Sequence, residues 1–446
     1  MILKITKSTD PVWKKKFVNV APNPQLEKIV ADMKETLAFT MGVGLAAPQV
    51  GYPYRLFIVS YTDLQETFLD PKIISKGKET DWVEEGCLSI PGHRGLVERA
   101  TEIELEYTNM KGERRVAKLS GFYARIAQHE YDHLDSTFYV QRIQKPKHLY
   151  KFEPIRIVFF GSSEFSATIL LSLIGQTYVG DYTVPLVITS PDKPAGRGQQ
   201  QQISPVKKLA QQFHITTISP DKLARRSGEN LELTNTEVYD QIKKTKPDML
   251  VLASYGKILP KEILDLPKYA PINVHPSLLP KYRGPSPIQA PILNGDRFTG
   301  VTIMKMNEKM DAGDLYVKGR YELKSDETSE SLSKALAELS KDLLHHTIHY
   351  LIIKKIKTKP QDPTKANYTK IIHREDGKID WQNPPAGGTK NLERMVRAYY
   401  PWPGVWTEYN GKNLKLLPKQ MVQLEGKNPV SLKSFQSGHK DFTISW

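Results

Sequence analysis

IRIVFFGSSEF, at residues 155–165, decides the fold of the larger part of this chain. A short apolar run that ends in Gly and Ser is typical of a buried β-strand followed by a turn and a helix N-terminus. Further strand-like runs follow, namely VPLVITS (184–190), DMLVLAS (248–254), INVHPS (272–277) and GVTIMKM (300–306). They alternate with helical patterns at 204–213 and 330–351. The alternation predicts an α/β, Rossmann-like domain on a parallel sheet.

Two basic, proline-bearing stretches border this domain, at 141–156 and 357–375. Such composition is typical of the segments that join domains. Beyond the second stretch, short alternating segments such as VWTEYN, NLKLLPK and FTISW predict a small all-β domain. The sequence therefore predicts three domains and two linkers. Their expected ranges are 1–147, a linker at 148–154, 155–356, a linker at 357–375, and 376–446.

Composition limits the class of protein and its partners. With 446 residues, 39% hydrophobic and 25% charged, the chain has enough apolar material for several globular cores. It has neither a membrane-length apolar run nor a signal-peptide core, and its single cysteine predicts a reducing, cytoplasmic location. The net charge is +14, and residues 331–446 hold 19 basic against 10 acidic side chains. That excess favours a nucleic-acid partner, with a solvated lysine-rich surface as the alternative.

A metal-site pattern stands in the first domain. His129-Glu130-x-x-His133 places two imidazoles on one helix face with a carboxylate beside them. The only cysteine, Cys87 in EEGCLSIPG, offers a thiolate as a third ligand, which leaves one position open on a catalytic metal. In GVGLAAPQV, Gly44 permits close backbone approach to a ligand and Gln49 can donate to an oxyanion.

The three motifs together, in this order, resemble those of peptide deformylase, over about residues 5–145. The resemblance implies an α+β domain and a metal, iron(II) with zinc, nickel or cobalt as alternatives, held by Cys87, His129 and His133. It also implies that a water activated at the metal attacks the N-formyl carbon while Glu130 carries the proton. Gln49 and the Leu88 N–H would hold the oxyanion. A zinc metalloprotease of the HExxH type is the alternative.

A second set of polar residues follows strands of the middle domain. Asn273 and His275 stand two apart at a strand end, so they point the same way into the crevice at the carboxyl edge of the sheet. Asp311 lies in a Gly-bearing loop after the next strand. A donor, a base and an orienting carboxylate suit acyl transfer to a substrate that brings its own amine.

These residues with the SLLPKYRG loop resemble the tetrahydrofolate-dependent formyltransferases, and 188–210 with RAYYPWPGVW (397–406) resemble methionyl-tRNA formyltransferase within that group. The resemblance implies 10-formyltetrahydrofolate as donor and an oxyanion held by Asn273, with proton and charge handled by His275 and Asp311. It also implies binding residues: Ser277, Leu278, Leu279 and Pro280 against the folate, and Lys193 and Arg197 on tRNA. The C-terminal domain is expected to be an OB-like barrel that is shorter than usual in the family.

The combined hypothesis is a fusion enzyme of N-formylmethionine metabolism. One half would formylate initiator methionyl-tRNA, and the other would deformylate nascent peptides, near the ribosome and away from membranes. Two alternatives stay open. The second half could be a formyltransferase for a sugar nucleotide or glycinamide ribonucleotide, or the chain could be an RNA- or ribosome-binding factor with decayed sites.

Overall fold

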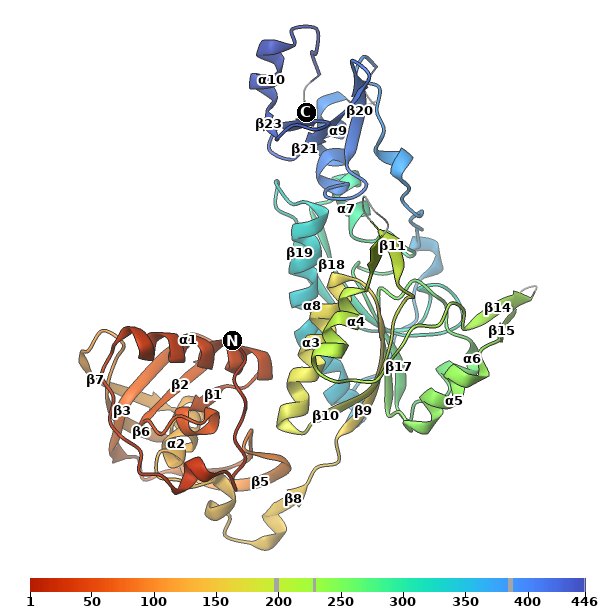
Figure 1. The fold of residues 1–446 in the computed structure, drawn as a ribbon. Coiled ribbons are helices and arrows are strands. Elements are labelled where there is room, and N and C mark those ends of the chain that lie inside the picture. Colours follow the sequence, from red (N-terminus) through yellow and green to blue (C-terminus); the bar gives the residue numbers. More distant parts are fainter. Residues whose placement is uncertain (196–199, 228–229, 384–387, 445) are drawn as a thin grey trace. The chain divides into compact units, whose positions relative to one another are not determined.

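The computed structural model describes residues 1–446 except 196–199, 228–229, 384–387 and 445. The chain divides into two compact units (Figure 1). The first comprises Met1–Arg156 with Leu171–Val184, and the second comprises Ile157–Leu170 with Pro185–Trp446. Among the described residues, none of the helices combines the length and the apolar character that crossing a membrane requires.

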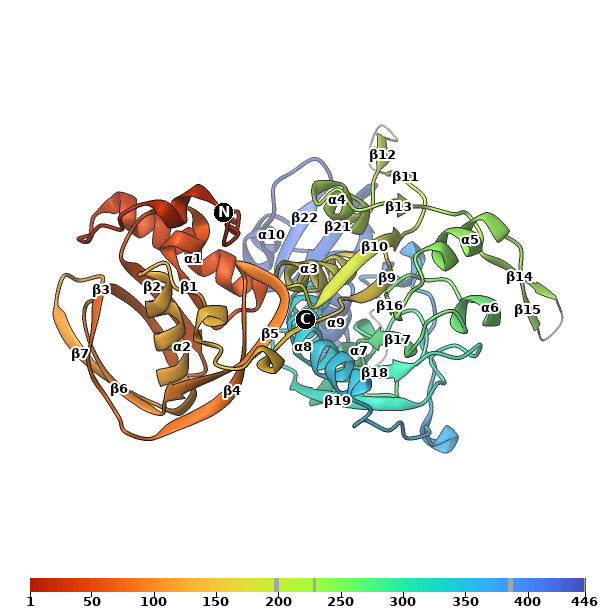
Figure 2. The same cartoon turned by 90° about the horizontal axis from the view of Figure 1, so that it is seen from below.

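The first unit is an α+β fold with two antiparallel sheets, ordered β1-β2-β3-β6-β7 and β4-β5-β8. Its main elements are α1 (Pro24–Thr40), β1 (Gly44–Ala46), β2 (Leu56–Tyr61), β3 (Leu64–Lys76), β4 (Thr80–Cys87), β5 (Ile90–Ala100), β6 (Glu102–Thr108), β7 (Arg114–Ser120), α2 (Gly121–His133) and β8 (Leu149–Lys151). Helix α2 packs against strands of both sheets (Figure 2).

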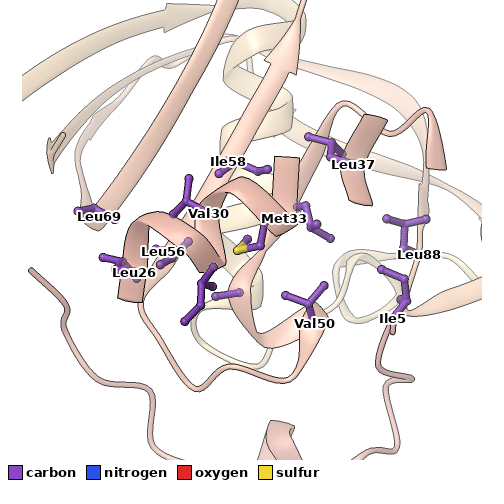
Figure 3. Packing of buried hydrophobic residues seen from close by; sticks show 13 residues of the cluster. Ile5, Leu26, Val30, Met33, Leu37, Val50, Leu56, Ile58, Leu69 and Leu88 are labelled. Carbon is purple, nitrogen blue, oxygen red and sulfur yellow. The ribbon is translucent and has the colours of Figure 1, made fainter. Parts of the chain in front are cut away.

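Helix α1 shows why these elements assemble. The Asn23 side chain caps its start by accepting from the Leu26 N–H, and the left-handed Met41 ends it. Apolar residues recur at helical spacing along one face and meet alternate residues of β2, which produces the core shown in Figure 3. That core contains Leu26, Val30, Met33 and Leu37 from α1, with Leu56 and Ile58 from β2.

The chain from residue 155 onward builds a seven-stranded sheet, ordered β13-β10-β9-β16-β17-β18-β19. Its elements are β9 (Ile155–Gly161), α3 (Glu164–Val179), β10 (Tyr182–Ile188), β11 (Lys193–Ala195), β12 (Gln200–Gln202), α4 (Pro205–Gln212), β13 (Thr217–Ile218), β14 (Ala224–Ser227), β15 (Asn230–Leu233), α5 (Thr236–Lys244), β16 (Met249–Ala253), α6 (Lys261–Leu264), β17 (Ala270–His275), α7 (Gln289–Asn294), β18 (Phe298–Lys305), β19 (Leu315–Glu322) and α8 (Ser329–Ile352). Figure 1 shows α5 and α6 on one side of this sheet and α8 on the other.

The prediction of a wholly parallel sheet was wrong at one edge. Strand β16 pairs in parallel with β9 and β17, but β18 runs antiparallel to both β17 and β19. A parallel crossover normally needs a helix that spans the sheet. The connection at 276–297 holds only the six-residue α7, so the chain returns in the opposite direction.

The last part of the chain folds around a four-stranded antiparallel sheet, ordered β20-β21-β22-β23. Its elements are α9 (Gly388–Ala398), β20 (Val405–Tyr409), β21 (Lys412–Leu417), β22 (Met421–Leu424), β23 (Val430–Ser431) and α10 (Leu432–Gly438). The segment FTISW was expected to be a strand, and its described residues, 442–444 and 446, do not form one. Its alternation arises because Phe442, Ile444 and Trp446 fill the core beside the sheet.

Candidate active sites

Helix α2 and the end of β4 bring three metal-capable side chains together. His129 and His133 lie one turn apart on α2, and Cys87 is the last residue of β4. The Cys87 Sγ lies 3.3 Å from the His133 Nε2, and the ligand atoms of all three residues lie within 4.8 Å of one another. One sulfur and two imidazole nitrogens suit a divalent first-row metal and leave a coordination position for a substrate or water. The donor set therefore fits the metal expected from the sequence.

In His129 and His133, a hydrogen bond at Nδ1 orients the imidazole ring and so determines that Nε2 is the nitrogen left to bind a metal beside Cys87. The His129 Nδ1 lies 2.9 Å from the Glu85 Oε2, and the His133 Nδ1 lies 3.2 Å from the Thr137 carbonyl oxygen. A carbonyl can only accept, so Nδ1 of His133 carries the proton and its Nε2 lone pair is available as a ligand. Burial lowers the pKa of His133 well below its usual value, which keeps the ring in its neutral, ligating form.

A buried ionic network supports His129 from behind. Arg99 donates to the Glu85 Oε1 over 2.6 Å and to the Asp132 Oδ2 over 2.9 Å, and Arg125 donates to the same Glu85 oxygen over 2.7 Å. Burial opposes ionisation of Glu85, but bonds from His129 and Arg99 hold its pKa well below the usual range. Such partners orient metal-binding imidazoles. Sequence analysis missed this network because nothing local marks Arg99.

Glu130 is almost fully buried, and its Oε2 has no hydrogen-bond partner among the described residues. Burial raises the pKa of this carboxyl to about 7, which suits a group that takes and returns a proton. A Cβ placed on Gly44 would lie 2.5 Å from the Glu130 Oε1, so only glycine allows this approach. The Gln49 Nε2 lies 3.5 Å from the Cys87 Sγ. One cavity of about 280 Å³ is lined by Gly44, Gln49, Cys87, Leu88, His129 and Glu130.

The second predicted set also assembles, at the carboxyl end of β17. The Asn273 Nδ2 donates to the Asp311 Oδ1 over 3.1 Å, and the His275 Nδ1 lies 3.6 Å from the same oxygen. The Gly284 N–H donates to the other carboxylate oxygen over 2.8 Å. The Asp311 carboxylate is therefore fixed between a strand end and the loop that follows it.

The orientation of His275 follows from its other ring nitrogen. The His275 Nε2 lies 2.9 Å from the Tyr282 carbonyl oxygen, which can only accept a hydrogen bond. In the neutral ring Nε2 therefore carries the proton, and the Nδ1 lone pair faces the Asp311 carboxylate. Nδ1 is therefore the atom at which this ring can accept a proton.

Asn273, His275 and Asp311 border a cavity of about 770 Å³. Residues that sequence analysis did not single out complete its wall, including Ser162, Ser190, Tyr255, Leu259, Met304 and Met306. Most of them lie at or just after the ends of strands β9, β10, β16 and β18. Their position at a strand end is the sequence signal that could have identified them.

The predicted folate-contact turn lies elsewhere. None of the four residues Ser277, Leu278, Leu279 and Pro280, all of them described, lines the large cavity. The Ser277 hydroxyl donates to the Lys281 carbonyl oxygen, Leu279 packs with Met304 and Leu315, and Leu278 borders a separate pocket. Of the apolar side chains in the turn, Leu279 is the one that fills core space. The side chains of Lys193 and Arg197, predicted to contact tRNA, lie outside the described residues.

Three family models match the chain in succession. Residues 2–149 match the polypeptide deformylase model, residues 155–348 the formyl transferase model, and residues 371–429 the formyl transferase C-terminal domain model. Together they cover most of the residues that line the two cavities, and strands β20, β21 and β22 of the C-terminal sheet.

Individual proteins are also similar to parts of the chain. Methionyl-tRNA formyltransferase of Caldicellulosiruptor saccharolyticus is 39% identical over 282 residues, which are 63% of this chain and 83% of that protein. The enzyme of the same name from Caldanaerobacter subterraneus is 38% identical, over 62% of this chain and 84% of its own. Peptide deformylase from Thermotoga maritima has a solved structure that is 36% identical, with a TM-score of 0.32, over 32% of this chain and 99% of its own.

Proposed function

Because the chain belongs to the methionyl-tRNA formyltransferase family and carries a peptide deformylase domain before it, we propose that both sites act in one pathway of N-formylmethionine metabolism. The formyltransferase part implies a folate-derived formyl donor and initiator tRNA as substrate, and the deformylase part implies a metal. We further propose 10-formyltetrahydrofolate as the donor, iron(II) as the metal, nascent N-formylmethionyl peptides near the ribosome as substrates of the first site, and the cytoplasm as the compartment.

In the transfer reaction, the methionyl amine attacks the formyl carbon, and the bond from that carbon to the folate nitrogen then breaks. The proton lost by the amine passes through His275 to the departing folate nitrogen. The second N–H of the Asn273 amide, not used by Asp311, is the donor for the developing oxyanion. His275 takes the amine proton at Nδ1, and Asp311 stabilises the resulting imidazolium across 3.6 Å. The cavity of about 770 Å³ is large enough for a folate-sized donor.

In the hydrolytic reaction, Cys87, His129 and His133 would hold the metal, whose Lewis acidity polarises the formyl carbonyl and acidifies a water. Glu130 receives the water proton and delivers it to the departing amine, a task that its pKa of about 7 suits. The Gln49 amide and the Leu88 N–H donate to the oxyanion.

The observation that carries the proposal is that each constellation lies in its own cavity, with a histidine fixed for a different task in each. The test uses two single variants of the full chain, each assayed for deformylation of a formylmethionyl peptide and for formylation of methionyl-tRNA. Glu130→Gln should lose deformylation by about 10²–10⁴ and keep formylation, and His275→Ala should do the reverse.

Two results would contradict this assignment. Loss of both activities in either variant would mean that the sites are not separate. Equal formylation of free methionine and methionyl-tRNA would replace the tRNA substrate with a small molecule.

A further inference from the structure

The segment expected to be the second linker is tied to the transfer site. We call residues 358–371 the strap. Its Lys359 exchanges two backbone hydrogen bonds with Leu315, at 2.8 and 2.9 Å. Further along, the Asn367 carbonyl accepts from the Arg283 N–H over 3.0 Å, and the Thr369 N–H donates to the Arg283 carbonyl over 2.7 Å. The strap therefore contacts the start of β19, just after the Asp311 loop, and the loop that follows β17.

Gln361 lies where the strap passes between these loops, and its amide contacts both. Its Nε2 donates to the carbonyl oxygens of Asp311, over 2.9 Å, and Gly313, over 2.7 Å. Its Oε1 accepts from the Arg283 Nε over 3.1 Å and from the Arg283 Nη2 over 2.8 Å. Both amide protons and both lone pairs of the oxygen are thus used, so the side chain has one orientation.

The two loops held by Gln361 are those that position the Asp311 carboxylate. Asp311 has a left-handed backbone, with φ of 49°, a conformation that a non-glycine residue keeps only when its surroundings hold it. Its side chain spans the same gap as Gln361, because the Gly284 N–H donates to its Oδ2. Gln361 and Asp311 therefore form two parallel connections between the Asp311 loop and the Arg283–Gly284 loop.

We propose that Gln361 is a positioning residue for formyl transfer, which sets the Asp311 carboxylate against Asn273 and His275. The inference rests on the proposed roles of His275 and Asp311. Gln361 is not among the described residues that line the transfer cavity, and it contacts Asp311 through the backbone carbonyl. It acts through the backbone of Asp311, from a segment about fifty residues further along the chain.

The chemistry of an amide makes the proposal testable with one isosteric change. Gln361→Glu keeps the acceptor that faces Arg283 and adds a charge that pairs with the guanidinium. It removes the two donors and places a carboxylate oxygen against the carbonyls of Asp311 and Gly313. The strap stays attached to the Arg283 side while the Asp311 loop loses its anchor.

For Gln361→Glu we expect kcat for methionyl-tRNA formylation to fall by about 10- to 100-fold, because small misplacements of catalytic groups have effects of this size. KM for both substrates should stay within about threefold of the wild-type value. Deformylation on the same preparation is the internal control.

Asp362→Ala is the matched variant, since within the described part of the chain the exposed Asp362 side chain bonds to Thr364 and Lys365 of the strap alone. It should leave kcat and KM unchanged. A Gln361→Glu enzyme with wild-type kcat would overturn the proposal. So would an equal fall of kcat in both variants, which would indicate general loosening of the strap. Failure of the wild-type chain to formylate methionyl-tRNA would instead contradict the proposed function.

Discussion

The two units hold their histidines by different ring nitrogens. In the first unit a carboxylate bonds to the Nδ1 of His129, and a backbone carbonyl bonds to the Nδ1 of His133. In the second unit a backbone carbonyl bonds to the Nε2 of His275. The first arrangement presents His133 Nε2 to the Cys87 thiolate, and the second presents Nδ1 to the Asp311 carboxylate. The same side chain thus becomes a metal ligand or a base according to which ring nitrogen the surrounding chain occupies.

The residues that position His129 also differ in charge from those that position Asp311. Behind His129 lie buried charges, in which Arg99 joins Glu85 and Asp132. Behind Asp311 lie a neutral amide, Gln361, and a backbone N–H. Removing one member of a buried charged network leaves an unpaired charge, which lowers the free energy of unfolding substantially. Removing a neutral hydrogen-bonding side chain lowers it less.

Metal removal should separate the two regions most strongly. Among the described residues, Cys87, His129 and His133 are the one group of three whose ligand atoms come together as a metal site. Treatment of the full chain with a chelator should abolish deformylation and leave methionyl-tRNA formylation unchanged. Metal analysis and both assays on one sample check this. Re-addition of metal should restore the wild-type chain but not Cys87→Ala, and recovery in that variant would exclude the thiolate as a ligand.

Removal of one buried charge should reveal the contrast between the supporting residues. Arg99→Met leaves Glu85 and Asp132 with less compensation, so we expect the first unit to lose about 3–5 kcal/mol of unfolding free energy. Gln361→Met removes a neutral side chain, with its two bonds to carbonyl oxygens and its acceptor for Arg283, and should destabilise the second unit by about 1–3 kcal/mol. Hydrogen exchange followed separately in each unit measures both values. Equal losses would mean that the charge of the first network is not what distinguishes it.

A smaller and local effect is expected at Gly44. In Gly44→Ala the new methyl group would collide with the Glu130 carboxylate, which must turn away from its present place. Deformylation should fall by about 10- to 100-fold with metal content unchanged, since the ligands are untouched. Gly112→Ala is the matched control, because no atom lies within 4 Å of a Cβ there, although its positive φ carries the usual strain. Loss of metal in Gly44→Ala would show that the glycine shapes the ligand set instead.

The features that could be predicted from the sequence are those that depend on residues close together in the chain. The His129 and His133 pair depends on helical spacing, and the Asn273 and His275 pair on strand alternation, so local patterns were enough. The direction of β18 depends on how the preceding connection folds, and no strand pattern contains that information. Arg99 and Gln361 act on residues about 33 and 50 positions away, through contacts that only the folded chain creates.

The smallest predicted effect concerns net charge, a further difference between the two units. The basic excess lies in residues 331–446, which belong to the second unit. Lys354 and Lys355 are exposed just after α8. Contacts between lysines and phosphates release counterions, so reversing both charges to Glu should weaken tRNA binding severalfold and reduce the slope of log affinity against log salt by about 1 per contact.

The same double reversal in the first unit, at the exposed Lys145 and Lys147, changes net charge by an equal amount and serves as the control. If the basic excess acts through local phosphate contacts, only the Lys354 and Lys355 variant should change the salt slope. Binding of methionyl-tRNA measured at several salt concentrations distinguishes the outcomes. Equal weakening by both variants would mean that tRNA responds to the net charge of the whole chain, and the contrast between the regions would not extend to RNA binding.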